Sequence, residues 1–446
     1  MSLSHLPPFV AALWYALAHG LDRRLQERFP QLLLGVLFAR GRRTVTSWIR
    51  AADLSDEFRQ AYRTVHAAGR NADLLSTRLL RVAQALGTAS PLTVALDDTP
   101  TPRWGPCVEG AGIHHNPNPG PAGEKFVYGH VWVALAVLVQ HPTDGPRALP
   151  IRSDLYVRAK DLTPDLKAQP WQFRTKLELA AEQLQWLQRW TSLSTATSDE
   201  AIRVVADGAY AKRPLLRVIR RLNLTLVSRL PRNAALWSLP PLQRRQGSRG
   251  PLPTYGKDRI SLAKRAGQQR GWQNLNCVQY RQLESKRVKT FLATWRPAGG
   301  LIRVVLVDET TGWRAYFSTD AAMSAQEILE LAADRGALEE TFKDLKEVWG
   351  AGQQQLRNVW ANVGAFNING WLYTAVEAWS WERSHEQLVN RSASPWDAPE
   401  RRPSHADKRK ALQREVLHAE TLEVLGGSHV SEGFWRLLDR LVGFAP

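Results

Sequence analysis

The order of the apolar segments between residues 91 and 230 constrains the fold of this chain more than any other feature of its sequence. Short runs rich in Val, Leu and Ala indicate strands, and amphipathic stretches with a period near 3.6 residues indicate helices. The expected strands are 92–99, 126–139, 147–156, 202–210 and 224–229, and the expected helices are 171–192 and 215–222. Three strands, a helix, a strand, a helix and a strand predict an α/β domain built in layers.

The remaining sequence predicts further parts around this domain. A loop rich in Pro, Gly and Arg, followed by alternating apolar residues, indicates a mostly β insertion whose basic loop is expected to contact phosphate. Ser324 followed by Glu327 predicts a capping box that starts a late helix. The basic run 401–410 is expected to be a solvated linker. The expected parts are an N-terminal helical DNA-binding domain (1–90), the first part of the core (91–230), the β insertion (231–320), the second part of the core (321–385), and a C-terminal linker with a helical tail (386–446).

The late helix carries three charged side chains at spacings of four and seven residues. Arg335, Glu339 and Lys346 fall within an arc of roughly 40° on a helix that turns about 100° per residue. Apolar residues with the same period lie beside this stripe, so Glu339 is expected at the border of the buried face, between two cations. A surface ion pair is the common alternative for a glutamate in such a position.

Carboxylates also close two of the predicted strands. Asp97 and Asp98 end the first strand, and Asp207 ends the fourth. A single aspartate at a strand end is usually a turn former, but together with Glu339 these residues predict a carboxylate cluster. Separated carboxylates suit Mg²⁺, a hard ion that also binds phosphate oxygens. Two such ions about 3.5–4 Å apart can promote phosphodiester cleavage.

The charge balance predicts a nucleic acid as the leading partner. The chain has 59 Lys and Arg against 42 Asp and Glu, a net charge of +17. Its 18 Trp and 44% hydrophobic residues predict a large core as well. Arg42 and Arg43 precede Thr44, which can cap a helix. Residues 1–90 therefore form either a small DNA-binding unit or a helical cap with solvated arginines.

The sequence predicts no membrane partner and a reducing compartment. No stretch has the 18 or more uncharged apolar residues that a membrane span requires. The apolar segment 9–17 is expected to be a helix and not a signal peptide. Two cysteines, Cys107 and Cys277, are too few for a disulfide framework, which favours a cytoplasmic location.

Taken in order, these motifs resemble the DDE insertion-sequence transposases of the class with the YREK signature. The matching motifs are Asp-Asp-Thr at 97–99, Asp-Gly-x-Tyr at 207–210, Val-Ser-Arg at 227–229 and Arg-x3-Glu-x6-Lys at 335–346. The resemblance covers residues 91–385. It implies a ribonuclease H-like mixed sheet with flanking helices, interrupted by a β insertion before the helix that carries the glutamate.

The resemblance also implies roles for individual residues. Asp97, Asp207 and Glu339 correspond to the catalytic, metal-binding acids, with Asp98 as the alternative to Asp97. They would hold two Mg²⁺ ions, with Mn²⁺ able to substitute. The signature tyrosine is replaced by Ala332. The residues expected to bind DNA are Arg335, Lys346, Arg229 and Tyr210, together with Arg42 and Arg43 from the N-terminal arginine cluster.

The implied function is cut-and-paste transposition: DNA cleavage at transposon ends, through a hairpin, and strand transfer into target DNA. The expected partners are double-stranded DNA with inverted repeats, target DNA, and a second copy of the chain in a nucleoid-associated homodimer. Two alternatives are a ribonuclease H-like nuclease without transposition and a catalytically idle DNA-binding regulator. Candidates for stacking on a flipped base are the insertion residues Trp237, Trp272, Trp295 and Trp313, each of which is more commonly a core residue.

Overall fold

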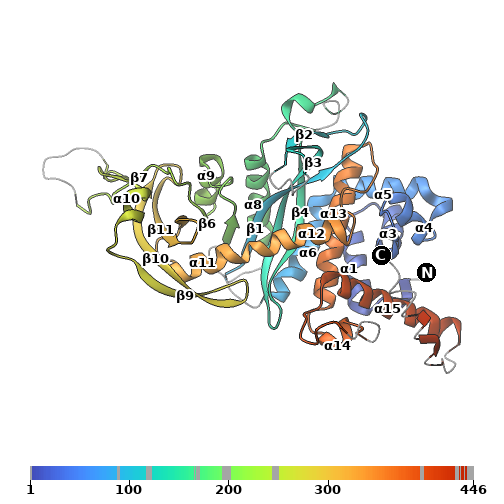
Figure 1. The fold of residues 1–446 in the computed structure, drawn as a ribbon. Coiled ribbons are helices and arrows are strands. Elements are labelled where there is room, and N and C mark those ends of the chain that lie inside the picture. The colour runs from blue at the N-terminus through green and yellow to red at the C-terminus, as the bar shows by residue number, and fades with distance from the viewer. Residues whose placement is uncertain are drawn as a thin grey trace.

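The computed structural model describes residues 3–87, 91–116, 123–164, 166, 171–192, 202–243, 251–391, 396–426, 431, 433–435 and 437–438. A large mixed sheet runs through the molecule, with helices on both of its faces and a helical layer at one end (Figure 1). None of the helices within these ranges is both long enough and apolar enough to cross a membrane.

The first half of the sheet has the order β4-β3-β1-β5-β6, with β2 beside β3. β3 pairs antiparallel with β1 and β4, whereas β1, β5 and β6 run parallel. This mixed order is consistent with a ribonuclease H-like fold. Its strands are β1 (Thr93–Pro102), β2 (Gly112–His115), β3 (Phe126–His141), β4 (Gly145–Tyr156), β5 (Arg203–Ala206) and β6 (Thr225–Arg229).

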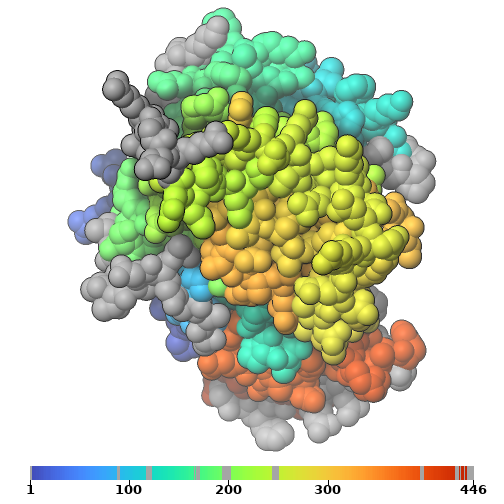
Figure 2. All heavy atoms as spheres, turned by 90° about the vertical axis from the view of Figure 1, so that its left-hand side faces the viewer, coloured from blue at the N-terminus to red at the C-terminus, as the bar shows by residue number. Residues whose placement is uncertain are grey.

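The second half of the sheet comes from residues 231–320 and continues the first half. β12 pairs antiparallel with β6, so Tyr316 lies opposite Arg229 and the backbone ladder is unbroken between the two halves. Figure 2 shows this part of the chain, in yellow-green to orange, on one face, and the following helix α11 (Ala325–Asp334) packs against β9 and β12. The elements are β7 (Leu236–Trp237), β8 (Arg259–Ile260), α10 (Leu262–Gly267), β9 (Gln273–Gln279), β10 (Gln282–Trp295), β11 (Gly300–Asp308) and β12 (Arg314–Ser318).

Two helix pairs cover the first half of the sheet. α8 (Lys176–Ser192) and α9 (Arg213–Arg221) pack together, α8 on β3 and β4 and α9 on β6. α12 (Gly336–Glu347) and α13 (Val359–Trp379) pack on β4, and α12 reaches β1.

α13 is buried along nearly its whole length, yet it carries polar residues for a structural reason. The Asn367 amide accepts a hydrogen bond from the Ser153 backbone N–H and donates one to the Ser153 carbonyl, both at 2.9 Å. Trp371 and Thr374 donate to the carbonyls of Ile151 and Pro150. These side chains satisfy the backbone of β4, which pairs only with β3 among the described strands.

The N-terminal helices share one hydrophobic core with the sheet and α13. α5 crosses α13 so closely that a Cβ on Gly69 would lie 1.9 Å from the Trp360 carbonyl oxygen. A Cβ on Gly364 would lie 1.9 Å from the Val65 carbonyl oxygen, so both positions require glycine. The helices are α1 (Pro8–Ala18), α2 (Arg23–Gln26), α3 (Arg28–Phe38), α4 (Val45–Ala51), α5 (Phe58–Arg70) and α6 (Ala72–Leu86).

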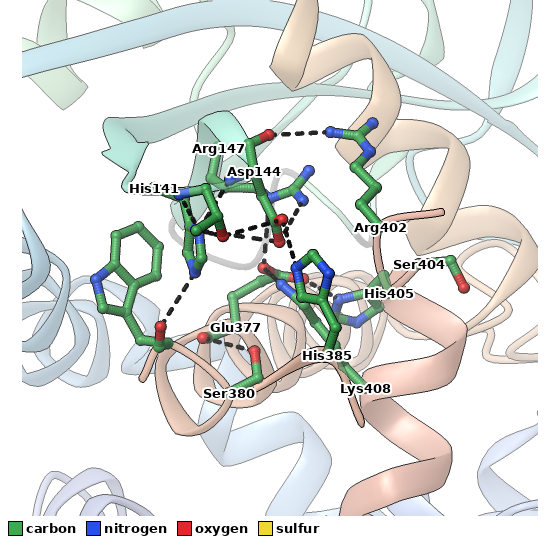
Figure 3. A network of polar contacts seen from close by, with 12 residues as sticks. His141, Asp144, Arg147, Glu377, Ser380, His385, Arg402, Ser404, His405 and Lys408 are labelled. Atoms are coloured by element: carbon green, nitrogen blue, oxygen red, sulfur yellow. Dashed lines mark hydrogen bonds and ion pairs between the residues drawn. The ribbon is translucent and has the colours of Figure 1, made fainter. Parts of the chain in front are cut away.

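The C-terminal part contains α14 (His385–Leu388) and α15 (His405–Val424), and α15 packs against α13 and α3. The expectation that the basic run 401–410 is solvated is wrong, because Lys408 is 1% and Arg409 5% exposed. Lys408 Nζ lies 2.6 Å from a carboxylate oxygen of Glu377 in α13 (Figure 3). Arg409 donates to the carbonyls of Leu37 and Val348. A buried countercharge and free carbonyls at helix ends therefore hold these cations inside the protein.

Candidate active site

Asp97 and Asp207 lie at the same level on neighbouring parallel strands. Leu96 pairs with Ala206, the last paired residues of β1 and β5, and the two aspartates come next. Neighbouring strands lie roughly 4.8 Å apart, so the aspartates share one edge of the parallel ladder. Arg229 extends the same row, since it follows Ser228, the partner of Ala206 on β6.

Asp97 and Asp98 point to opposite faces of the sheet, as successive strand residues do. Asp97 forms an ion pair with Arg335 on the face covered by α12. Asp98 lies on the face covered by α8, where Lys176 Nζ is 2.5 Å away and the Tyr210 hydroxyl donates a hydrogen bond of 3.0 Å. The structure therefore places Asp97, and not Asp98, on the side of Glu339.

Glu339 and Arg335 come from the junction of two nearly continuous helices. α11 (Ala325–Asp334) starts with the predicted capping box of Ser324 and Glu327. α12 begins at Gly336, and Arg335 between them keeps helical backbone angles. Arg335 also donates to Glu339 Oε1 at 2.7 Å. The Glu339 side chain is 60% exposed, so it lies on the solvent side of the helix and not at the border of its buried face, where it was expected.

Three carboxylates act on the single guanidinium of Arg335. Burial lowers the pKa of Arg335, but Asp97, Glu339 and Asp207 together outweigh burial and raise it. Burial raises the pKa of Asp97 to about 6. The Arg335 charge opposes that rise, and the charges of Asp98 and Asp207 add to it. The site thus concentrates negative charge around one internal cation.

The carboxylates are the right type of ligand for a hard divalent ion, but their placement here is closed to it. Within the described ranges, no three His, Cys, Asp or Glu side chains are grouped so that they could hold a metal. The guanidinium of Arg335 lies between Asp97 and Glu339, where a cation would bridge them. As placed, the three acids therefore do not fit a metal ion.

Tyr210 was expected to contact DNA, and the structure contradicts this. Its ring is 2% exposed, and its hydroxyl is hydrogen-bonded to Asp98. Burial is the main reason that the pKa of Tyr210 lies well above its usual value. The turn after β5, with the Tyr210 N–H bonded to the Asp207 carbonyl, carries the ring into the core. Tyr210 is thus a support for the strand carboxylates.

The remaining cations expected to bind DNA differ in accessibility. Arg229 and Arg42 are exposed. Lys346 is half-buried, and its desolvation lowers its pKa. Arg43 is 8% exposed, so the expectation of direct DNA contact is wrong for it. Its backbone bonds to the side chains of Gln353 and Gln354, which fastens the arginine turn to the segment that follows α12.

The tryptophans of the insertion are covered. Trp295 is 4% exposed and packs edge-on against Phe317. The other three are half-buried under cationic side chains, with Arg296 over Trp237, Lys289 over Trp272 and Arg232 over Trp313.

Trp104, which is 60% exposed in the loop after β1, is not among the residues predicted from the sequence. The guanidinium carbon of Arg42 lies 5.4 Å from the centre of its ring. Its position in the sequence could have indicated its exposure, because it is a tryptophan inside the Gly/Pro-rich loop directly after the strand that carries Asp97.

Comparison with known families gives one match. A family model described as DDE superfamily endonuclease matches residues 16–297, more than half of the chain. The match includes both strand aspartates and ends before α12, the helix of Glu339. A search of curated proteins finds no match.

Proposed function

Since this chain belongs to the DDE superfamily endonucleases, we propose that it is a transposase that cleaves DNA at transposon ends and joins those ends to target DNA. One observation carries the proposal. Asp97, Asp207 and Glu339 come from segments far apart in the sequence, yet Arg335 forms ion pairs with Asp97 and Glu339, and Asp207 lies beside Asp97 at the end of the neighbouring strand. Such convergence is expected of a catalytic carboxylate set and not of unrelated surface acids.

In a state in which the guanidinium of Arg335 has left Asp97 and Glu339, the three acids are the proposed ligands of Mg²⁺, two ions in the catalytic state, with Mn²⁺ able to substitute. Bound divalent ions would activate the attacking oxygen and stabilise the leaving oxygen of a phosphodiester. Asp98, held by Lys176 and Tyr210, braces the site from the other face, because its backbone N–H donates to Asp97 Oδ1 at 2.8 Å.

DNA is proposed to follow α12 away from the carboxylates. Seven residues of helix separate Glu339 from Lys346, roughly 10 Å of axial rise. Beyond Lys346, the loop at Gly350 lies against Arg43, and the exposed Arg42 is next in the chain. Arg229 lies on the opposite side of Asp207, so cations flank the acids along one line suited to a phosphate backbone.

Finer features of the function are proposed from the same motifs. The spacing of Arg335, Glu339 and Lys346 supports the YREK class, with Ala332 in place of the tyrosine and packed beside the small apolar cluster of α11. Members of that class act on inverted repeats as a homodimer and pass through a hairpin, and we propose the same here. A nucleoid-associated site of action follows from that substrate.

The test is incubation of the protein with Mg²⁺ and linear DNA that carries the ends of its own element. Nicks, hairpins and joined products at those ends support a transposase. Cleavage without preference for the ends indicates a general nuclease, and binding without cleavage indicates a regulator. Glu339→Gln should abolish cleavage and leave end binding nearly unchanged. Glu347→Gln, on the exposed side of the same helix, should change neither cleavage nor end binding. Normal cleavage by Glu339→Gln would refute its assigned role.

A further inference from the structure

The cation that lies at the carboxylates is the guanidinium of Arg335 and not the metal expected there. Arg335 forms ion pairs with Asp97 and Glu339 and is also within electrostatic reach of Asp207. Its side chain is only 21% exposed, so these charges interact in a partly desolvated setting. One guanidinium thus neutralises much of the charge that a divalent ion would need.

We propose that Arg335 is the resident cation of this site and that a divalent ion enters only after the guanidinium has moved away. Two cations held within one carboxylate cluster repel each other strongly. The inference rests on the proposed function, because it assumes that the same acids later bind metal.

A DNA phosphate is the partner that can draw Arg335 away. Guanidinium binds phosphate and carboxylate with the same two-pronged geometry. The only hydrogen bonds of the guanidinium among the described residues are those to Asp97 and Glu339. Arg335 would exchange its carboxylate partners for a phosphate, and the carboxylates would exchange the guanidinium for a metal ion. Every charge would therefore stay paired. Arrival of DNA would therefore open the site to metal.

Electron paramagnetic resonance of Mn²⁺ with the DNA-free protein tests this inference. Arg335→Gln should bind Mn²⁺ roughly tenfold more tightly than the wild type, since a bonded cation is removed. Arg229→Gln removes an equal charge beside Asp207 without breaking an ion pair to the acids, and it should change the affinity much less. The double variant Asp97→Asn, Arg335→Gln should lose the gain, which would place the metal at these acids.

Each outcome has one meaning. Equal Mn²⁺ affinity of the wild type and Arg335→Gln overturns the role of Arg335 and leaves the metal site standing. An equal gain in Arg229→Gln also overturns it, because general charge would then explain the effect. Absence of saturable Mn²⁺ binding in every variant refutes the proposed metal site itself, and the inference falls with it.

A second inference arises independently from Trp104. The loop that carries it is held rigidly on both sides. Arg103 is 5% exposed and donates to His130 Nδ1 and to the carbonyls of Gly352 and Gln354, at 2.8–2.9 Å. The Tyr128 hydroxyl donates to the Gly105 carbonyl at 3.0 Å. A large apolar ring is thus presented to solvent by a well-anchored backbone.

A pocket of about 350 Å³ adjoins the ring. Trp104 and Pro106 give it an apolar wall, and the exposed Gln355 and Arg357 give it polar groups. Neither Arg357 nor Arg42 forms an ion pair with a described carboxylate, and Arg42 lies over the ring of Trp104, so both positive charges can still be paired with an anion beside that ring. An aromatic face, an amide and two cations match the base and phosphate of one nucleotide.

We propose that Trp104 stacks on a single unpaired base of bound DNA, with Arg42 on the adjacent phosphate. The inference rests on the proposed function only in taking DNA as the ligand. Trp104 lies seven residues beyond Asp97 on the same chain, roughly 20 Å along the strand direction. It therefore contacts DNA well away from the cleavage site.

The test compares blunt duplexes with duplexes that end in a single-stranded overhang containing 2-aminopurine. Trp104→Ala should weaken binding of the overhang duplex roughly tenfold more than that of the blunt duplex, and stacking of the probe base, seen as fluorescence quenching, should disappear. Trp104→Phe should keep most of both effects. Trp396→Ala, which removes another exposed tryptophan (82% exposed), is the matched control and should change neither.

Equal losses on blunt and overhang DNA would overturn the stacking role, as would unchanged quenching in Trp104→Ala. Either result is compatible with DNA cleavage by the protein. Absence of DNA binding by the wild type would instead refute the proposed function.

Discussion

The substitution Gly364→Ala tests how the N-terminal helices are joined to the rest of the protein. The new Cβ would lie 1.9 Å from the Val65 carbonyl oxygen and 2.9 Å from the Gly69 nitrogen. Both are backbone atoms, which cannot rotate away as the end of a side chain can. α5 and α13 would have to separate by about 1.5 Å to restore an ordinary contact at 3.4 Å.

The expected effect follows from two opposing contributions. Alanine in a helix interior is favoured over glycine by up to about 1 kcal/mol. Overpacking usually costs about 1–3 kcal/mol, and a clash with backbone belongs at or above the upper end of that range. We therefore expect a net loss of about 2 kcal/mol in the free energy of unfolding.

Gly370→Ala is the matched control in the same helix. Its Cβ would meet Pro150 Cβ at 3.4 Å, an ordinary contact, so the substitution should be neutral or stabilise by up to about 1 kcal/mol. Urea unfolding followed by tryptophan fluorescence measures both variants. Equal midpoints for the two variants would refute the close crossing of α5 and α13.

The remaining predictions concern the supports of the site and the C-terminal helix. Tyr210→Phe should lower the cleavage rate, and it should lower the free energy of unfolding by about 1 kcal/mol. DNA binding should stay unchanged, because the lost hydrogen bond supports Asp98 and does not contact DNA. Weakening of DNA binding to the same extent as cleavage would contradict this. Arg42→Gln should weaken binding to all DNA sequences and reduce the slope of log affinity against log salt by about one, and a sequence-dependent loss would argue against a phosphate contact. Burial opposes ionisation of Glu377, but Lys408, His405 and Arg147 outweigh it and hold the pKa well below the unfolded value of 4.5. The stabilisation is therefore complete above about pH 4.5 and declines as the pH falls below it, and acid unfolding of Glu377→Gln should show a flatter dependence in that range.

Much of the fold follows from patterns within single segments. The apolar runs predict β1, β3, β4, β5 and β6 but not β2, which lies in the Gly/Pro-rich stretch after β1, and the capping box at Ser324 predicts where α11 starts. The choice between Asp97 and Asp98 needs the tertiary structure. Alternation along a strand puts the two aspartates on opposite faces of the sheet. Only the positions of α8 and α12 show that Glu339 lies on the same face as Asp97.

Burial of individual polar residues is harder to predict, because it depends on partners far away in the sequence. Lys408 is held by Glu377, 31 residues earlier, and Arg409 by carbonyls of α3. Nothing in the run 401–410 itself indicates these partners, so its charges suggest a solvated segment. The same applies to Tyr210, whose hydroxyl meets a carboxylate 112 residues earlier.

The side chains of α13 that bond to β4 have a consequence for how this molecule behaves towards its own copies. An outer strand with free N–H and C=O groups is a template on which another chain can add a strand. Asn367 occupies both groups of Ser153, and Thr374 and Trp371 occupy neighbouring carbonyls, so this margin offers an incoming strand little to pair with. The buried Asn367 of α13 thus helps to remove from this edge the free backbone groups on which another copy of the chain could add a strand.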